Sequence, residues 1–313
     1  MTRLTATLIA LACLSGAVLG EPIRADQLLL NRMGPGTPSS IHRLDLTTGA
    51  MLQLTDGKAQ DFDGCWLLDG TVVFASYDRQ GEVARLCRVQ ADGKQRTTLH
   101  EVKGGAIFNP TVSPDGKHIA FMQVPIDGPD DLPQVHIVNS DGSGARAIGP
   151  ATGSFPAWSP DGASILFVTG NPEPAQRAKL QTMDPQGGSL RVLFAGPDPI
   201  LDCAWSPDGK RVAFTVGMTL PNGERRTRIE VMNASAGAAP TTLVEGTSIC
   251  FGPHFSQDGS EVYYNRLTDE AIAIWKVGAG GGEGVKVADG VVGGGVMAMF
   301  LSGGPEPAPS PAP

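Results

Sequence analysis

Histidine is the side chain most often used for proton transfer and metal binding near neutral pH, and this chain of 313 residues contains few. The five are scattered with no metal-ligand spacing: His42, His100, His118, His136 and His254. A lone histidine is more often a hydrogen-bonding structural residue than a catalyst. The sequence therefore predicts no catalytic residue, no metal site and no cofactor, and we expect a protein that is not an enzyme.

The sequence does not support a nucleotide-binding motif or a serine-hydrolase motif. The run Gly278-Ala-Gly-Gly-Gly-Glu-Gly284 superficially resembles a nucleotide-binding loop, but it lies in a predicted turn and opens no helix. The Gly-x-Ser-x-Gly elbow of serine hydrolases does not occur in the sequence. Neither a dinucleotide site nor a serine-hydrolase site is expected.

Four cysteines follow residue 20: Cys65, Cys87, Cys203 and Cys250. Their spacings of 22, 116 and 47 residues match no compact disulfide framework and no zinc pattern. Buried free thiols that act as small hydrophobic residues are the favoured interpretation. Export would also permit disulfides, so their redox state stays open.

Residues 1–20 have the pattern of a secretory signal peptide. Arg3 is the only charge before Glu21, and the segment from Leu4 to Gly20 is apolar or small. We expect cleavage before Glu21 and a periplasmic or secreted protein with no transmembrane segment. Two alternatives are an uncleaved membrane anchor and lipid attachment at Cys13.

The charge balance narrows the choice of partners. Removing Arg3 changes the net charge from −8 to −9. This acidic excess, without a basic patch, argues against binding nucleic acid and against docking on anionic lipid. A protein partner is expected instead, and we expect the chain itself to be a monomer.

An internal repeat predicts the architecture. Three nearly superimposable segments contain Ser-Pro-Asp-Gly, and two looser copies flank them. The Asp-Gly pairs, spaced by 46, 46, 47 and 50 residues, are Asp69-Gly70, Asp115-Gly116, Asp161-Gly162, Asp208-Gly209 and Asp258-Gly259. A period of this length that holds four strand-sized runs is typical of a β-propeller blade.

Each part of the repeat has a structural role. Proline presets φ in the turn, aspartate suits the next position, and glycine takes the left-handed conformation. A large residue three positions before the aspartate is expected to wedge between blades: Trp66, Val112, Trp158, Trp205 and Phe255. An aromatic residue recurs on the returning strand after the turn.

The repeat predicts an all-β, six-bladed propeller with four-stranded blades over residues 21–304. A strand at Val296–Phe300 has no returning strand after it, and the strand Leu28–Asn31 has no inner strand before it. These two halves complete one blade, so the N- and C-terminal strands close the ring and leave no exposed sheet edge. Residues 305–313 form a proline-rich tail that is expected to be disordered.

Polar residues recur near the start of the predicted inner strands. Six positions before the repeat aspartate lie Asp63, Asn109 and Asp202, and Asp61 and His254 lie close by. We expect these five side chains to gather at one mouth of the central channel, where they would bind a partner. The alternative is that they are solvated residues without a role in binding.

The repeated Ser-Pro-Asp-Gly-x-x-Ile-Ala-Phe element resembles the WD40-like repeat of the TolB-like propellers, over roughly residues 28–303. We expect no counterpart of the α/β domain that precedes the propeller in TolB. The resemblance implies an exported, non-catalytic scaffold that binds a protein partner, such as a Pal-like envelope protein. Two alternatives are a carbohydrate-active propeller, such as an oligogalacturonate-type polysaccharide lyase, and an envelope structural or sensory module.

Overall fold

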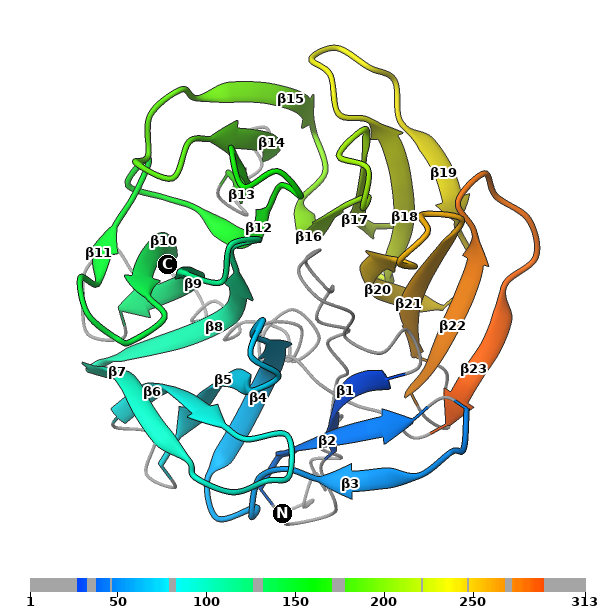
Figure 1. The fold of residues 1–313 in the computed structure, drawn as a ribbon. Coiled ribbons are helices and arrows are strands. Elements are labelled where there is room, and N and C mark those ends of the chain that lie inside the picture. The colour runs from blue at the N-terminus through cyan, green and yellow to red at the C-terminus, as the bar shows by residue number, and fades with distance from the viewer. Residues whose placement is uncertain are drawn as a thin grey trace, which may run out of the picture.

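The computed structural model describes residues 27–32, 38–45, 47–78, 83–125, 132–170, 178–220, 222–246, 248–267 and 272–289. Within these ranges the chain forms only β-strands, arranged as six antiparallel sheets around a central axis (Figure 1). The sheets follow one another along the chain, and we number them as blades 1 to 6. The chain is therefore an all-β, six-bladed propeller, as the repeat predicts.

Neighbouring strands in each blade are consecutive in sequence. Blade 1 has three described strands, β1 (Gln27–Arg32), β2 (Ser40–Asp45) and β3 (Met51–Gln53). Blade 2 comprises β4 (Gln60–Trp66), β5 (Val72–Tyr77), β6 (Val83–Val89) and β7 (Thr97–Lys103). Blade 3 comprises β8 (Gly105–Val112), β9 (His118–Pro125), β10 (Gln134–Asn139) and β11 (Arg146–Ala147).

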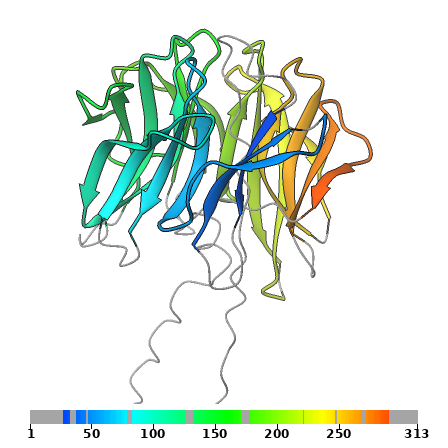
Figure 2. The same cartoon turned by 60° about the horizontal axis from the view of Figure 1, so that its bottom comes forward.

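The other three blades repeat this pattern. Blade 4 comprises β12 (Ser154–Trp158), β13 (Ile165–Thr169), β14 (Ala178–Met183) and β15 (Arg191–Gly196). Blade 5 comprises β16 (Ile200–Trp205), β17 (Arg211–Thr219), β18 (Arg225–Asn233) and β19 (Thr241–Val244). Blade 6 comprises β20 (Ile249–Phe255), β21 (Glu261–Leu267), β22 (Ile272–Gly278) and β23 (Val285–Asp289). In the view of Figure 2, the yellow-green hairpin of β17 and β18 projects beyond the other described strands.

The Ser-Pro-Asp-Gly turns join the first and second strands of blades 3 to 5. In blade 3, Ser113 Oγ donates to Asp115 Oδ1 at 2.6 Å, and the Gly116 N–H donates to the Ser113 carbonyl at 2.8 Å. Gly116 has φ of 70°, which favours glycine. The serine hydrogen bond holds the pKa of Asp115 below its usual value. These hydrogen bonds of the turn are thus made between residues of the same turn.

These turns also connect one blade to the next. A Cβ placed on Gly162 would lie 3.5 Å from Pro114 Cδ of the preceding blade, so the glycine packs against that proline ring. Gly209 packs in the same way against Pro160. In blade 3, Gly116 packs against Leu68, which occupies the position of the proline in the Ser-Pro-Asp-Gly turns of blades 3 to 5. The proline of the motif therefore fixes its own turn and also packs against the turn glycine of the following blade.

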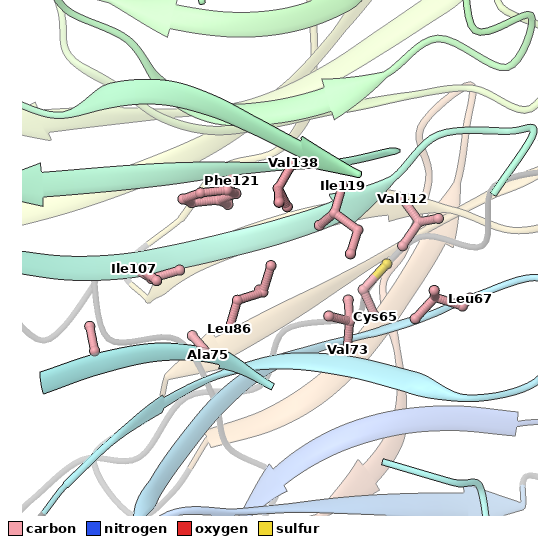
Figure 3. Packing of buried hydrophobic residues seen from close by; sticks show 11 residues of the cluster. Cys65, Leu67, Val73, Ala75, Leu86, Ile107, Val112, Ile119, Phe121 and Val138 are labelled. Atoms are coloured by element: carbon pink, nitrogen blue, oxygen red, sulfur yellow. The ribbon is translucent and has the colours of Figure 1, made fainter. Parts of the chain in front are cut away.

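The core is divided among the blade interfaces. Six clusters of buried hydrophobic residues each span one pair of neighbouring blades. The cluster between blades 2 and 3 contains Phe121, Leu86 and Ile107, all fully buried (Figure 3). Phe121 belongs to the recurring aromatic position, whose members are also fully buried in the other blades: Phe74, Phe167, Phe214 and Tyr264.

The large residues before the turns lie at these interfaces. Trp158 is 5% exposed and packs between blades 3 and 4. Trp205 packs between blades 4 and 5, and its Nε1–H donates to the Ala157 carbonyl of the preceding blade at 3.2 Å. Trp66 packs between blades 1 and 2.

The segments assigned to the signal peptide, to the closing strand Val296–Phe300 and to the proline-rich tail lie outside the described residues. The closure of blade 1 by the C-terminal strand therefore stays a prediction at this point. Within the described chain, the four cysteines Cys65, Cys87, Cys203 and Cys250 are buried and free. No helix there is long and apolar enough to span a membrane.

Candidate functional site

The innermost strands of the propeller share a distortion at the level of the predicted site. In β4, β8, β12 and β20 the residue six positions before the turn aspartate has a positive φ: Asp63 at 56°, Asn109 at 50°, Phe155 at 54° and Gly252 at 63°. At this point the register with the second strand shifts, so that two residues oppose one. This bulge bends each inner strand and re-aims its side chains.

The strand β16 departs from this pattern. Its register shift lies between Ile200 and Asp202, one residue earlier than in the other blades, and Asp202 keeps a negative φ. Asp202 therefore pairs with Thr215 on β17 as an ordinary strand residue. Its Oδ1 accepts a hydrogen bond from the Cys203 N–H at 2.7 Å. The sequence repeat, which aligns Asp202 with Asp63, contains no signal of this difference.

Asp63 and Asn109 form a contact between blades 2 and 3. Asp63 is 3% exposed, and its Oδ2 accepts a hydrogen bond from the Asn109 N–H at 3.0 Å. The side-chain Oδ1 of Asn109 is buried and has no hydrogen-bond partner among the described residues. One carboxylate oxygen of Asp63 is thus committed to the fold, whereas Asn109 retains an acceptor for a group that the described chain does not supply.

Burial shifts the pKa values of two ionisable side chains in this region. Blades 2 and 5 lie opposite each other in the ring. Desolvation, reinforced by the negative charge of Asp63, raises the pKa of Asp202 to about 7. On the adjacent inner strand β20, desolvation lowers the pKa of His254 to about 4, so this imidazole is neutral at pH 7. Asp202 is consequently a group at this level whose charge changes near neutral pH.

Asp61 is placed differently from the expectation for a channel mouth. Its carboxylate is fully buried and accepts two hydrogen bonds from Arg96, at 3.0 and 3.1 Å. Arg96 also donates to Ser76 Oγ at 2.6 Å and lies over the Phe74 ring. These contacts tie together the strands of blade 2. Asp61 is therefore a structural residue in this conformation, out of reach of a partner.

Metal ligands do not gather in the described part of the chain. No group of three or more histidine, cysteine, aspartate or glutamate side chains there could hold an ion. Of the other histidines, His100 and His136 flank the Phe121 ring between blades 2 and 3, with ring centroids 5.7 and 5.6 Å from it. Burial lowers the pKa of both imidazoles.

Arg96 is the residue of this region that sequence reasoning missed. It lies between β6 and β7, outside the repeat motif, and belongs to a stretch of exposed turn residues. Only the folded blade brings its guanidinium to Asp61. The pairing of an inner-strand carboxylate with a distant arginine leaves no periodic signal in the sequence.

No protein-family model matches the sequence, and no curated protein matches it. Solved structures do match. TolB from Acinetobacter baumannii aligns with a TM-score of 0.65 and 17% identity, over 82% of this chain and 62% of that one. This chain thus spans less than two thirds of that TolB.

Two further solved structures share this fold. A putative TolB from Agrobacterium tumefaciens aligns with a TM-score of 0.67 and 18% identity, over 83% of this chain and 91% of that one. An oligogalacturonate lyase in complex with manganese aligns with a TM-score of 0.57 and 16% identity, over 89% and 78% of the two chains. One architecture thus carries different functions. This chain has the fold of the TolB-like six-bladed β-propellers.

Proposed function

We propose that this protein is a non-catalytic propeller of the cell envelope that binds a protein partner at the inner strands of its ring. The observation that carries the proposal is the set of acceptors at one level of these strands. Asn109 Oδ1 has no partner among the described residues, and Asp202 is half-buried and receives one hydrogen bond. The signal-peptide pattern predicted for residues 1–20 supports export, and the fold shared with TolB supports a role in binding proteins.

The chemistry of these residues favours a particular kind of partner. Asp63 and Asp202 give this level of the inner strands an acidic character, and His254 adds no positive charge at pH 7. A partner that inserts hydrogen-bond donors or basic side chains would complement it, as a Pal-like envelope protein with an exposed basic loop would. Salt should then weaken association, because exposed charges are screened beyond about 8–10 Å at physiological ionic strength.

The experiment compares capture by matched variants in intact cells. Asp202→Asn keeps the shape of the side chain and removes its charge, whereas Glu283→Gln does the same at an exposed position beyond β22. Cross-linking followed by mass spectrometry identifies what the wild type captures. The proposal predicts that Asp202→Asn weakens capture of that partner by about tenfold, or about 1.4 kcal/mol, and that Glu283→Gln does not. Equal capture by both variants would place the binding surface elsewhere.

A polysaccharide lyase is the second candidate, and the raised pKa of Asp202 favours it. A carboxyl that titrates near pH 7 suits general acid–base catalysis, His254 lies on the neighbouring inner strand, and the manganese-bound lyase shares the fold. The test is an assay of the wild type on uronate polymers with added manganese. Metal-dependent cleavage that is lost in His254→Ala would establish this candidate and refute the scaffold.

A further inference from the structure

The hairpin of β17 and β18 projects beyond the other described strands (Figure 2). Its tip carries Asn222 followed by Gly223, and the sequence contains no other Asn-Gly pair. Both residues are exposed. A Cβ placed on Gly223 would have no atom of the described chain within 4 Å, apart from those of its chain neighbours. The tip therefore lies clear of the rest of the described ring.

Three hydrogen bonds hold the turn at this tip. The Leu220 N–H donates to the Glu224 carbonyl at 2.8 Å, and the Gly223 N–H donates to the Leu220 carbonyl at 2.8 Å. The Glu224 N–H donates to Asn222 Oδ1 at 3.0 Å. This last bond makes an Asx turn, which folds the side chain of Asn222 back along the following backbone. The amide carbon Cγ of Asn222 is thus held near the Gly223 nitrogen.

Two turns that join the third and fourth strands of blades 2 and 3 are built in the same way. Residues 90–94 and 139–143 repeat the three hydrogen bonds, at 2.8–3.0 Å, with aspartate in place of asparagine. Hydrogen bonds within each turn lower the pKa of these aspartates, Asp92 and Asp141, so both are ionised at pH 7. The tip of the hairpin thus has a neutral amide where the two equivalent turns have a negative carboxylate.

An amide and a carboxylate differ in their reaction with a nitrogen nucleophile. A carboxylate repels the nucleophile and has no good leaving group, whereas the Asn222 amide is neutral and can release ammonia. The Glu224 N–H already contacts Asn222 Oδ1, the oxygen on which negative charge develops when Cγ is attacked. A donor at this position stabilises the tetrahedral intermediate. The nearest nucleophile along the chain is the Gly223 nitrogen, which glycine leaves accessible because it has no side chain.

The attack requires the turn to open, because the Gly223 N–H must first leave the Leu220 carbonyl. The equivalent glycines are packed against the preceding blade. A Cβ on Gly142 would lie 2.3 Å from the Leu99 carbonyl oxygen, and Gly93 also lies against the backbone of its neighbour. Gly223 has no such contact in the described chain, and exposed loop tips open at little cost in free energy. The amide therefore lies in the turn that opens most readily of the three.

We propose that Asn222 is a site of spontaneous covalent modification, at which the amide is hydrolysed to a carboxylate. The Gly223 nitrogen forms a bond to Asn222 Cγ, the bond from Cγ to Nδ2 breaks, and the amide group leaves as ammonia with the proton of the Gly223 nitrogen. The product is a succinimide ring. Water then opens this ring at Cγ to give aspartate, or at the main-chain carbonyl to give isoaspartate. The reaction consumes water alone.

The conversion changes the charge of the tip. Its charged residues are Glu224, Arg225 and Arg226, so the net charge of the tip falls from +1 (two positive, one negative) to 0. The aspartate product fits the turn, because Asp92 and Asp141 make the same hydrogen bonds. The isoaspartate product adds one carbon to the backbone and cannot keep all three bonds. The proposal is independent of the proposed function.

The first test incubates the full-length protein in isotopically labelled water at mildly alkaline pH. Peptide mass spectrometry should show loss of the amide and uptake of labelled oxygen at Asn222, and isoelectric focusing should show a shift of one negative charge per molecule. Asn139 and Asn233 are internal controls, because they precede serine and alanine. Both should keep their amides while Asn222 reacts. The variant Asn222→Gln, which must close a larger ring, should not shift in the same time.

The second test removes the turn by incubating the full-length chain unfolded in urea. If Asn222 reacts there but keeps its amide in the folded protein, the turn protects the site and the proposal is wrong. Equal conversion of Asn139 and Asn222 in the folded protein would also refute it. Asn222→Asp should melt at the same temperature as the wild type. A lower midpoint would show that aspartate does not fit this turn and would overturn its equivalence with the two Asp-Gly turns.

Discussion

Two interfaces between blades differ in the number of buried hydrophobic residues and in the close contacts of their turns. The cluster between blades 2 and 3 has eleven buried hydrophobic residues, whereas the cluster between blades 6 and 1 has three among the described residues. Gly142 of blade 3 lies so close to the Leu99 carbonyl of blade 2 that a Cβ would overlap it, while Gly49 of blade 1 has nothing within 4 Å. The repeat is uniform in its turns, yet the described parts of its interfaces are unequal.

The largest expected effect comes from removing the C-terminal segment. Truncation after Gly290 deletes Val296, Met297, Met299 and Phe300. Full burial of each such side chain is worth about 1.5–3 kcal/mol, and the sum rivals the total stability of an ordinary domain. We expect loss of the cooperative thermal transition, measured by circular dichroism. Truncation after Gly304 is the control and should leave the transition unchanged. Equal melting of the two truncations would mean that the interface between blades 6 and 1 is complete without this segment.

The next contrast compares one repeat position at the two interfaces. Phe121 faces blade 2 and Leu30 faces blade 6, and both are fully buried. Phe121→Ala should lower the free energy of unfolding by about 3–5 kcal/mol, and Leu30→Ala by about 2 kcal/mol, because its described cluster is smaller. Urea denaturation measures both. A larger loss for Leu30→Ala would reverse the order of the two interfaces.

A smaller loss of stability is expected when alanine replaces a turn glycine, and it measures the contact between that turn and the neighbouring blade. Gly142 has φ of 91° and Gly49 has φ of 71°, so alanine meets left-handed strain at both sites, about 1–2 kcal/mol. Only at Gly142 would it also press on the neighbouring blade. Gly142→Ala should therefore be the more destabilising variant by urea denaturation. If the two variants lose the same free energy, the close approach to Leu99 contributes nothing.

The last prediction concerns the dependence of stability on pH. The pKa of Asp202 is about 7 in the folded protein, against 3.8 for an ordinary aspartate, so the folded state binds its proton more tightly than the unfolded state. This contribution to stability is present below pH 4 and is lost as the pH rises through 7. Asp202→Asn should flatten that decline in urea midpoints. Asp141→Asn, at an exposed turn, should not flatten it.

The sequence predicted the six-bladed fold because the repeat is local: Ser113, Asp115 and Gly116 satisfy one another within one turn. The candidate site was harder to predict. Asp61 and Asp63 are two residues apart, yet one pairs with Arg96 and the other contacts Asn109 of the next blade. Alignment also equated Asp202 with Asp63, although the bulge of β16 lies one residue earlier. Such differences arise from contacts between blades, which a repeat period does not encode.

The turn glycines of blades 3 to 6 each contact the preceding blade, which gives this part of the ring a direction of assembly. Gly162 packs against Pro114 and Gly209 packs against Pro160, so blades 4 and 5 each contact the blade that was synthesised just before them. During synthesis, blades 3 to 6 can each dock as soon as they emerge. Blade 1 is made first, but the blade on which it rests is made last. A nascent chain therefore carries a blade 1 that can pack on blade 2 but lacks its contacts with blade 6 until the C-terminal part of the chain is made.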